Sequence, residues 1–304
     1  MYPVTIRDVI IVGAGPSGIS AAVQLKRYNI EALLLEKDEV GGLLKNANLV
    51  ENYPGFPRGI SGEDLVKLFK QQLEEYEIET RFENVLKIDF ENDVFTVVTN
   101  KGIHLSSSIV IASGTKPRRI PSAKIAKGAD KKVFYEIHKL YNVAGKSIAI
   151  IGAGDAAFDY ALSLSKNNKV VIFNKGRTVK CLPLLWKRAI NSRNISYFAG
   201  VRVDSVNCHK SGLLLSCNDI VHGDNFEVYT SYLVIAVGRE PCLDFLSGRI
   251  RNELEKLQRM HLLYMIGDVK NGIYRQVAIA VGDGIKSAME IHEKLRRIIH
   301  ESDM

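Results

Sequence analysis

The chain has 304 residues, of which 46% are hydrophobic and 25% are charged, a composition typical of a globular protein with two domains. No apolar run approaches the roughly 20 residues that span a bilayer, and Met1–Arg7 lead directly into the first predicted strand, so we expect no membrane segment, no signal peptide and a cytoplasmic location. The formal net charge of +7 favours an anionic cofactor or an acidic partner, whereas the lack of a dense basic stripe with interleaved aromatics argues against nucleic-acid binding.

The first predicted unit is a strand, a helix and a second strand. The apolar run Asp8–Val12 ends in glycines, Gly18–Tyr28 has the character of a helix, and Ala32–Leu35 is again apolar. Residues Glu77–Thr99 then alternate in the manner of a small antiparallel sheet, and Ser107–Ser113 is a short apolar strand that ends in a glycine.

A second unit of the same kind begins at Ser147–Ile151, continues through an alanine-rich helix and ends at Val170–Phe173. Ser231–Val237 repeats the pattern of the earlier short strand that ends in a glycine. We therefore predict an α/β protein with two Rossmann-like dinucleotide-binding domains.

Two segments are typical of crossings between these domains. Lys116–Lys132 is rich in prolines, small residues and charges, as linkers are, and Gly238–Pro241 is a second crossing point. After it, Leu262–Ile266 and the amphipathic helix Val277–Ile299 are expected to return to the first domain. We predict a discontinuous first domain of residues 1–117 and 242–304, and a second domain of residues 118–241.

The first glycine turn, VGAGPSG, lies between a strand and a helix. Gly13 permits the tight turn, Gly15 lets the backbone approach a pyrophosphate, and Gly18 lets helix and strand pack closely. Glu36 closes the second strand, where a carboxylate accepts hydrogen bonds from ribose hydroxyls. The pattern predicts a dinucleotide site; the alternative is a glycine-rich turn that only packs.

The second glycine turn, IGAGDAA, again joins a strand to a helix through Gly152, Gly154 and Ala157. No acidic residue follows its second strand to bind a free ribose 2′-hydroxyl. Basic side chains that neutralise a 2′-phosphate stand there instead, namely Lys175, Arg177 and Lys180. The pattern favours NADPH over NADH, and the alternative is a solvated basic turn.

Two dinucleotide sites in one chain indicate FAD together with a nicotinamide nucleotide. Hydride transfer requires the nicotinamide within about 3–3.5 Å of the flavin, and the protein supplies position and exclusion of water. The first domain is then the FAD-binding domain, and the second is the NAD(P)-binding domain.

Four stretches of the sequence are distinctive: GAGPSGISAA, ENYPGFPRGISGEDL, IASGTKPRRI and IGDVKNGIYRQVAIAVGDG. Through them the sequence resembles, over essentially its whole length, the low-molecular-weight thioredoxin reductases, a group of two-domain flavoproteins. The last stretch is the most specific, because its GD pair and YRQ triplet have the spacing of the family. The resemblance also implies a homodimer.

Carried over by position, the resemblance implies further cofactor contacts. Gly41, Gly42 and Asn52 are expected along the isoalloxazine, and Asp268 at the ribityl chain, where the alternative is a helix-capping turn. The expected FAD set is Gly13, Gly15, Ser17, Gly18, Glu36, Gly41, Gly42, Asn52, Gly114, Gly267, Asp268, Arg275, Gln276 and Val277. The expected NAD(P) set is Gly152, Gly154, Asp155, Ala156, Ala157, Asn174, Lys175, Arg177 and Gly238.

The chain departs from the family at the redox dithiol. Counting back from Gly152, the two cysteines of the family fall on Tyr135 and His138. Tyrosine and histidine cannot form a disulfide, so thioredoxin reduction by the family's dithiol relay is not expected. His138 is a candidate for hydrogen bonding or proton donation at the flavin, and Tyr135 is a candidate for stacking on it. The plainer interpretation is that both fill the space of the cysteines.

The four cysteines that the chain does contain, Cys181, Cys208, Cys217 and Cys242, lie elsewhere and have neither Cys-x-x-Cys nor zinc spacing. They are typical of isolated thiols in a reducing cytosol, and we expect no metal. Two further departures concern other segments. The stretch NKGR, Asn174–Arg177, stands where the family has a motif with more arginines for the 2′-phosphate, which weakens the NADPH assignment. The Gly238–Gly267 segment is shorter than in the family, which predicts a trimmed hairpin.

A sister group, the thioredoxin-reductase-type ferredoxin–NADP reductases, shares the fold and also lacks the cysteines. The stretch FYEIHKLYNVAGKSIAIIGAGDAAFDYAL resembles that group, including Asp155 and Asp159. Members of the group extend beyond the last helix to cover the flavin, whereas this chain stops at Met304, which predicts an unshielded ring.

We therefore expect an FAD-dependent NAD(P)H oxidoreductase in which electrons pass through FAD directly to an external acceptor, either a ferredoxin- or flavodoxin-like carrier or a small oxidant. A basic linker favours an acidic carrier, although a solvated linker is an equally good interpretation. Its basic residues are Lys116, Arg118, Arg119, Lys124, Lys127, Lys131 and Lys132. Two alternatives stay open: a disulfide or thioredoxin reductase-like enzyme that uses a non-adjacent cysteine such as Cys181 or Cys242, and a nucleotide-sensing flavoprotein without turnover.

Overall fold

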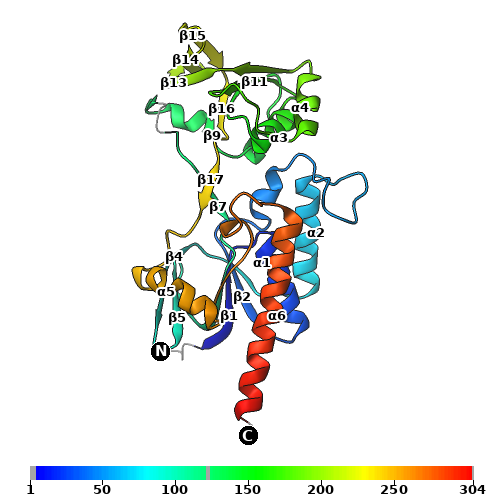
Figure 1. The fold of residues 1–304 in the computed structure, drawn as a ribbon, viewed down its shortest axis with the longest axis vertical. Coiled ribbons are helices and arrows are strands. Elements are labelled where there is room, and N and C mark those ends of the chain that lie inside the picture. Colours follow the sequence, from blue (N-terminus) through cyan, green and yellow to red (C-terminus); the bar gives the residue numbers. More distant parts are fainter. Residues whose placement is uncertain (1–4, 121–123, 303–304) are drawn as a thin grey trace. The chain divides into compact units, whose positions relative to one another are not determined.

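The computed structural model describes residues 5–120 and 124–302, and the chain divides into two compact units (Figure 1). Unit 1 comprises Met1–Lys45, Val50–Lys116 and Pro241–Met304, and unit 2 comprises Asn46–Leu49 and Pro117–Glu240. These boundaries lie one residue from the expected ones. The assignment of Asn46–Leu49 to unit 2 was not anticipated from the sequence.

Unit 1 is built on a seven-stranded sheet in the order β3-β2-β1-β6-β5-β4, with β18 also paired to β6. β1, β2, β3, β6 and β18 are parallel, whereas β4 and β5 are antiparallel to their neighbours. The strands are β1 Ile6–Val12, β2 Ala32–Glu36, β3 Thr80–Phe82, β4 Val85–Glu91, β5 Val94–Thr99, β6 Ile103–Ile111 and β18 Leu263–Met265.

The expected antiparallel sheet within Glu77–Thr99 is confirmed for β4 and β5 but is wrong for β3. This strand pairs with β2 in parallel, through Leu34 opposite Thr80. The physical reason is the helix α2 (Gly62–Glu75) between them, because a helical crossover returns the chain in the same direction.

The helices of unit 1 cover the sheet (Figure 1). They are α1 Pro16–Arg27, α2 Gly62–Glu75, α5 Gly248–Arg259 and α6 Val277–Ser302, with the short 3₁₀ helices η1 Gly42–Asn46 and η4 Gly267–Val269. Where a trimmed hairpin was expected, the chain forms α5, so that prediction is wrong. The Ser247 hydroxyl accepts a hydrogen bond from the Ile250 amide to start this helix, and Ile250 and Leu257 are buried in the core of the sheet.

Unit 2 contains a five-stranded parallel sheet, ordered β12-β11-β10-β16-β9, and a four-stranded sheet, ordered β15-β14-β13-β8. The parallel sheet consists of β9 Val133–Phe134, β10 Ser147–Ile151, β11 Lys169–Asn174, β12 Ile195–Ala199 and β16 Tyr232–Ile235. The other comprises β8 Lys124–Ile125, β13 Val201–His209, β14 Gly212–Asp219 and β15 Asn225–Thr230. Helices α3 Asp155–Leu164 and α4 Pro183–Ile190 and the 3₁₀ helices η2 Ala129–Lys132 and η3 His138–Leu140 complete the unit.

The parallel sheet of unit 2 has an apolar layer on each side. One layer includes Phe158 and Leu164 of α3, and the other joins Phe173 and Leu233 to Leu215 of the second sheet. This arrangement explains the near-continuous apolar runs of β10, β11 and β16, because both faces of these strands are buried.

The predicted linker Lys116–Lys132 is wrong over much of its length. Lys124 and Ile125 form β8, which pairs with Ser205 and Val206, and Ala129 is fully buried. Residues 121–123 of the segment lie outside the described residues. The connections between the units are β7 (Thr115–Pro117) and β17 (Arg239–Pro241), which pair as a two-stranded sheet. Among the described residues, the search for a helix of sufficient length and apolarity to span a bilayer finds no candidate.

Candidate dinucleotide sites

The first glycine turn lies where the strand order of unit 1 reverses. β1 has β2 on one side and β6 on the other, and doubly wound folds bind dinucleotides at the carboxyl end of such a strand. Gly13 has a φ of +106°, and a Cβ atom there would lie 2.4 Å from the Ala112 carbonyl oxygen. At Gly18 a Cβ would lie 1.9 Å from the Gly13 oxygen, so both positions require glycine for backbone reasons.

Gly15 is different, because nothing lies within 4 Å of the position of its missing Cβ and its φ is an ordinary −79°. It is the N-cap of α1 and supplies no side-chain cap, which leaves the helix N-terminus open to an anion. An open backbone at a helix N-terminus fits the pyrophosphate of FAD, and Gly13, Gly15, Ser17 and Gly18 are the residues that would hold it.

Glu36 is held against this turn. The side chain is buried; its Oε2 accepts from the Ala14 amide at 2.8 Å, and its Oε1 accepts from the Asp38 amide at 3.0 Å. Each carboxylate oxygen retains a second lone pair, so Glu36 can still accept from a ribose hydroxyl. The role of Glu36 at the adenosine end of FAD stays a prediction.

Three distant segments meet the same turn. The Gly41 amide donates to the Ala14 oxygen at 2.8 Å, and a Cβ at Gly42 would lie 3.4 Å from the Gly15 Cα. Gly267 packs on α1, where its Cβ would lie 2.5 Å from the Ser17 Oγ. The structure therefore brings much of the expected FAD set together around the first glycine turn.

The remaining expected FAD residues lie on neighbouring segments of unit 1. The Asn52 amide donates to the Gln276 side-chain oxygen at 3.0 Å, although the two residues are 224 positions apart. Asp268 is in η4, Arg275 and Gln276 directly precede α6, and Val277 begins it. Gly114, with a φ of +64°, follows β6.

Asp283 is a residue that sequence reasoning missed. Its Oδ2 accepts from the Gly267 amide at 3.0 Å and from the Asn271 side chain at 2.7 Å, while its Oδ1 pairs with Lys270 at 3.3 Å. It thereby fixes η4, which carries Asp268. The only signal in the sequence is an acidic residue among small and apolar ones in AVGDGI.

The second glycine turn repeats this geometry in unit 2, because β10 lies between β11 and β16. Gly152 has a φ of +138°, and its Cβ would lie 2.2 Å from the Ala236 oxygen. Gly154 has nothing within 4 Å of its missing Cβ, and Ala157 is fully buried on α3. Gly152, Gly154, Asp155, Ala156 and Ala157 therefore form a turn that fits a nicotinamide dinucleotide.

The basic turn after β11 is organised by Asn174. Its Oδ1 accepts from the Gly176 amide at 2.9 Å, and its Nδ2 donates to the Thr178 oxygen and to the Tyr197 hydroxyl. Lys175 and Arg177 are exposed on this turn, and the Lys180 amide donates to the Ala153 oxygen at 3.0 Å, beside Gly154. The three basic residues are thus exposed on the segment that follows β11, and one of them, Lys180, contacts the glycine turn through its backbone.

Two other expected contacts in unit 2 support local structure. The Asp155 Oδ1 accepts from the Leu182 amide at 2.7 Å. Gly238 has a φ of +108°, and its oxygen accepts from the Arg118 amide, which belongs to the chain leaving β7.

The segment that replaces the dithiol is held by Asn46, a second residue that sequence reasoning missed. The Asn46 side chain is buried, and its Oδ1 accepts from the Ile137 amide at 3.0 Å, the His138 amide at 3.0 Å and the His138 Nδ1 at 3.2 Å. Glu136 lies 3.8 Å from the His138 ring and also pairs with Arg239. Tyr135 packs against the core of unit 2. These contacts favour the plainer interpretation, in which both residues fill space.

The cysteines do not reconstitute a dithiol within unit 2. All four are free thiols, and on the paired strands β13 and β14 Cys208 is opposite Leu213 while Cys217 is opposite Val203. Burial raises the pKa of Cys217 to about 11 and also raises the pKa of Cys181, which makes both poor nucleophiles near neutral pH. Cys242 is the one cysteine of unit 1, and its amide donates to the Gly114 oxygen at 3.1 Å.

Comparison with known proteins agrees with this geometry. Residues 7–284 match the family model described as pyridine nucleotide-disulphide oxidoreductase. A thioredoxin reductase of Borreliella burgdorferi is 29% identical, covering 96% of this chain and 93% of its own. A crystal structure of T. acidophilum thioredoxin reductase is 28% identical with a TM-score of 0.82, covering 95% of this chain and 98% of that one. The crystal structure of Lactococcus lactis thioredoxin reductase is 24% identical and shares the fold, with a TM-score of 0.82. The match covers 94% of this chain and 98% of that one.

The match spans both glycine turns and most of the described elements. It confirms the expected fold class, the resemblance to thioredoxin reductases and the two cofactors, FAD and a nicotinamide nucleotide. The alternative of a flavoprotein without turnover loses its support. The chain belongs to the pyridine nucleotide-disulphide oxidoreductase family and is an FAD-dependent NAD(P)H oxidoreductase.

Proposed function

We propose that electrons pass from NAD(P)H through FAD directly to an external acceptor, with no internal dithiol between them. The observation that carries this proposal is the pair Tyr135 and His138 at the positions of the family's cysteines. Their surroundings support it, because the Asn46 oxygen and the core of unit 2 engage them as structural residues.

The chemistry balances without a relay. Bound FAD supplies the two-electron chemistry, since it accepts a hydride from the nicotinamide and can release its electrons singly or together. Two one-electron carriers, or one two-electron oxidant, complete the cycle. The chain's own task is to hold both dinucleotides, for which we propose the expected sets around Gly15 and Gly154.

The same arrangement supports NADPH as the preferred donor. Lys175 and Arg177 are exposed on the turn after β11, and Lys180 lies beside Gly154. Three cations and no acidic residue within Asn174–Lys180 suit the 2′-phosphate of NADPH.

The experiment that tests the missing relay compares acceptors in thiol variants. We expect the FAD-loaded Cys242→Ser and Cys181→Ser proteins to reduce ferricyanide with NADPH at the rate of the unaltered protein. Cys208→Ser, which removes an exposed thiol, is the matched control. Ferricyanide takes electrons from the flavin directly in either candidate, so the deciding substrate is a small aromatic disulfide. Disulfide reduction by the unaltered protein that is lost in either variant, with FAD content and ferricyanide reduction retained, would contradict the proposal.

Disulfide reduction through a single cysteine is the second candidate, and the relatives favour it more than the first. They are named thioredoxin reductases, and the family name itself includes disulphide. Cys242 is the residue to examine, because its carbonyl accepts from the Ser113 hydroxyl at 2.7 Å and its amide donates to Gly114, an expected FAD contact. This candidate predicts that Cys242→Ser loses reduction of a small aromatic disulfide or of thioredoxin while ferricyanide reduction survives.

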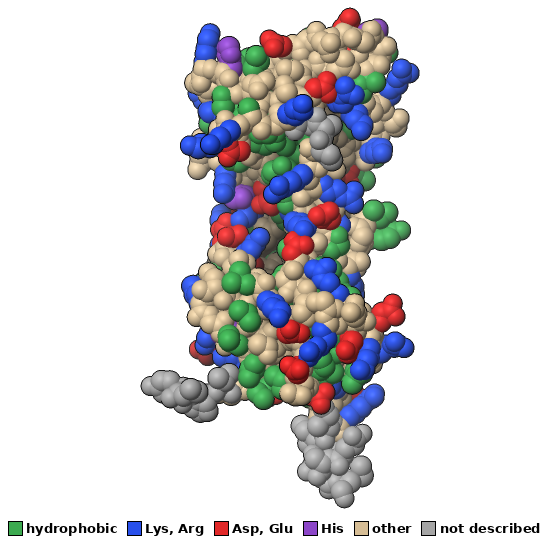
Figure 2. All heavy atoms as spheres, turned by 90° about the vertical axis from the view of Figure 1, so that its left-hand side faces the viewer, with side chains coloured by type: hydrophobic (Ala, Val, Ile, Leu, Met, Phe, Trp, Pro, Cys, Tyr) green, Lys and Arg blue, Asp and Glu red, His purple; other side chains and the backbone are tan. Residues whose placement is uncertain are grey.

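The acceptor of the first candidate is proposed to be an acidic carrier protein or a small oxidant. The supporting basic residues Arg118, Arg119, Lys124, Lys127 and Lys131 belong to unit 2, whereas Lys116 pairs with Asp244 and Lys132 donates to the Ser211 oxygen. On the face drawn in Figure 2, basic side chains are interspersed with acidic ones. We propose that any steering comes from the net charge together with these exposed cations.

We also infer a homodimer. Two neighbouring apolar side chains on the loop before α6, Ile273 at 87% and Tyr274 at 70% exposure, together with Met289 on α6, give unit 1 apolar surface that a second copy can cover. Sedimentation equilibrium is expected to give twice the 33.9 kDa of one chain, and a value for a single chain would contradict it.

A further inference from the structure

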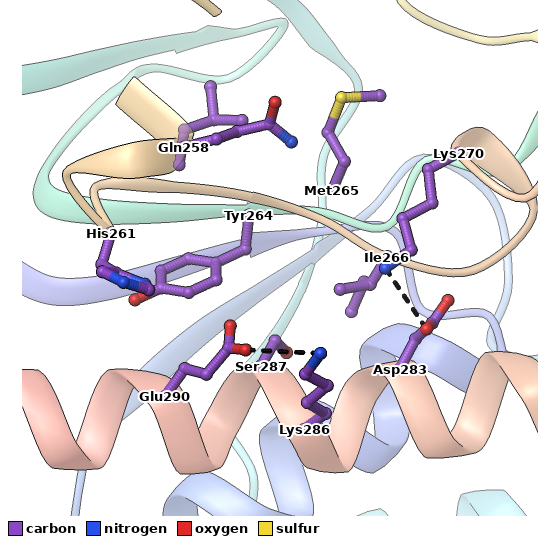
Figure 3. Close-up of a pocket in the computed structure, with 11 residues that line it drawn as sticks. Gln258, His261, Tyr264, Met265, Ile266, Lys270, Asp283, Lys286, Ser287 and Glu290 are labelled. Carbon is purple, nitrogen blue, oxygen red and sulfur yellow. Dashed lines mark ion pairs between the residues drawn. The ribbon is translucent and has the colours of Figure 1, made fainter. Parts of the chain in front are cut away.

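Unit 1 contains a pocket that the two dinucleotide sites do not use. It has a volume of about 170 Å³ and lies between the edge of β18, the end of α5 and one face of α6 (Figure 3). From α6 it is lined by Asp283, Lys286, Ser287 and Glu290. On the other side lie Gln258 and His261, which end and follow α5.

The floor of the pocket is a strand edge. Within the described part of the chain β18 pairs with one strand, β6, to which the Leu262 oxygen and the Ile266 amide are bonded. Backbone groups alternate along a strand, so those of Leu263 and Met265 point to the opposite edge, where the pocket lies. The pocket therefore offers main-chain donors and acceptors as well as side chains.

Tyr264 gives the strongest indication that a polar ligand belongs here. The residue is 94% buried by area, and within residues 5–120 and 124–302 its hydroxyl has no hydrogen-bond partner. Burial, together with the charge of Glu290, raises the pKa of Tyr264. The hydroxyl therefore stays protonated and can donate a hydrogen bond. Buried donors in native proteins are nearly always satisfied, so this hydroxyl calls for an acceptor that the described residues do not supply.

The charges of the pocket are balanced. Lys270 pairs with Asp283 at 3.3 Å and Lys286 pairs with Glu290 at 3.7 Å, the two ion pairs drawn in Figure 3. A ligand with a single negative charge would meet the two carboxylates as well as the two lysines, and a ligand with a single positive charge would meet the two lysines as well as the two carboxylates. A ligand that carries both charges a short distance apart can engage Lys286 and Glu290 together.

We propose that this pocket binds a small zwitterion of the size of a free amino acid. Its carboxylate accepts from the Tyr264 hydroxyl and from Lys286, and its ammonium group faces Glu290. The proposal does not depend on the electron acceptor. Asp283, on the wall of the pocket, also holds η4 through the Gly267 amide, so an occupied pocket adjoins the proposed FAD site.

The test is calorimetric titration of the FAD-loaded protein with the proteinogenic L-amino acids, one at a time, and with acetate and methylammonium as probes of a single charge. We expect saturable binding of at least one amino acid, and weaker binding of both single-charge probes. Tyr264→Phe keeps the ring and removes the donor, and Lys286→Met keeps the length and removes the charge. Each variant is expected to weaken the binding about tenfold or more, since hydrogen bonds to charged groups are among the stronger ones.

Tyr76→Phe is the matched control, because this tyrosine lies at the end of α2 and not in the pocket. It should bind the amino acid as the unaltered protein does, and all variants should retain FAD. The proposal is wrong if no amino acid binds, if acetate or methylammonium binds as tightly as the amino acid, or if Tyr264→Phe and Lys286→Met both leave the affinity unchanged.

Discussion

Gly15 and Gly154 are the residues at which cofactor binding can be separated from folding. At Gly13, Gly18 and Gly152 a side chain would collide with the backbone, so substitution there disturbs the fold itself. At Gly15 and Gly154 the missing Cβ faces open space. This is the difference expected between a glycine needed for packing and a glycine needed for a ligand.

Gly15→Ala is therefore expected to fold normally and to lose FAD. The backbone angles at Gly15 suit alanine, but the methyl group would enter the open space that we propose for the pyrophosphate, and it should weaken FAD binding about tenfold or more. The measurement is the FAD content after purification, with the melting temperature of the apoprotein as the check on folding. Gly248→Ala, also in open space but on α5, is the control and should retain FAD.

The sequence was sufficient to predict residues whose role follows from local geometry. The glycine turns and Glu36 have fixed spacings from a strand and a helix, so their positions could be read directly. Asn46 and Asp283 could not be found in this way, because their partners, Ile137 and Gly267, are set by tertiary contacts. The sequence shows that an amide or a carboxylate stands in an apolar stretch, but it does not show which residue will be its hydrogen-bond partner.

Among the elements, α1 and α6 determine how the first glycine turn is supported. Ser20 of α1 donates through its hydroxyl to the Val281 oxygen of α6 at 3.0 Å. The two helices approach closely at Gly284, where a Cβ would lie 2.0 Å from the Ser20 Oγ and 2.3 Å from the Ser17 oxygen. Ser17 lies in the first turn of α1, which follows the glycine turn, so this contact connects α6 to the proposed FAD site.

Gly284→Ala and Gly282→Ala are predicted to have opposite effects. The first forces the helices apart and should lower the free energy of unfolding by about 1–3 kcal/mol, with partial loss of FAD. The second faces open space within the same helix and should raise the free energy of unfolding by about 0.5–1 kcal/mol, because alanine is the better helix former. Denaturant unfolding of the FAD-loaded proteins distinguishes them; equal effects would contradict the close packing.

Asn46→Ala is predicted to loosen the segment that replaces the dithiol. Three donors lose their shared acceptor, which at about 1 kcal/mol each should cost about 2–3 kcal/mol locally. Hydrogen exchange at the Ile137 and His138 amides should accelerate accordingly. Asn46→Asp keeps an acceptor and should preserve most of the protection; unchanged exchange in Asn46→Ala would show that the bonds do not hold the segment.

The elements also show where sequence reasoning ends. The strands β1, β10 and β11 were predictable because their apolar runs are local patterns. β8 was missed because a two-residue strand exists only through its pairing with β13. α5 was missed because the prediction relied on the length of this segment relative to the family. The Ser247 cap and the helical spacing of Ile250 and Leu257 were the signals for a helix. The parallel direction of β3 follows from the intervening helix and not from its own residues.

At the scale of the whole molecule, the chain is a two-cofactor oxidoreductase whose acceptor is the open question. If the acceptor is an acidic carrier protein, its reduction should slow as salt rises, because the net charge of +7 then steers the encounter. The rate of reduction of a ferredoxin or flavodoxin is expected to fall about tenfold or more between low and high ionic strength. Ferricyanide is not a suitable control, because it is itself charged. An uncharged quinone is a suitable control, and the rate of its reduction should not depend on ionic strength.

An equal response of carrier and quinone to salt would remove the argument from charge. It would leave a small oxidant or a disulfide as the acceptor, and the Cys242→Ser comparison would then decide between them.

The most direct test of the central claim is an anaerobic titration of the FAD-loaded protein with NADPH, repeated with NADH, while the flavin absorbance is followed. Without an internal dithiol the absorbance should be bleached by about one equivalent of NADPH per FAD, with NADH less effective, because FAD is the only group that takes up two electrons. An end point near two equivalents would reveal a second two-electron group within the chain and would contradict direct transfer from the flavin.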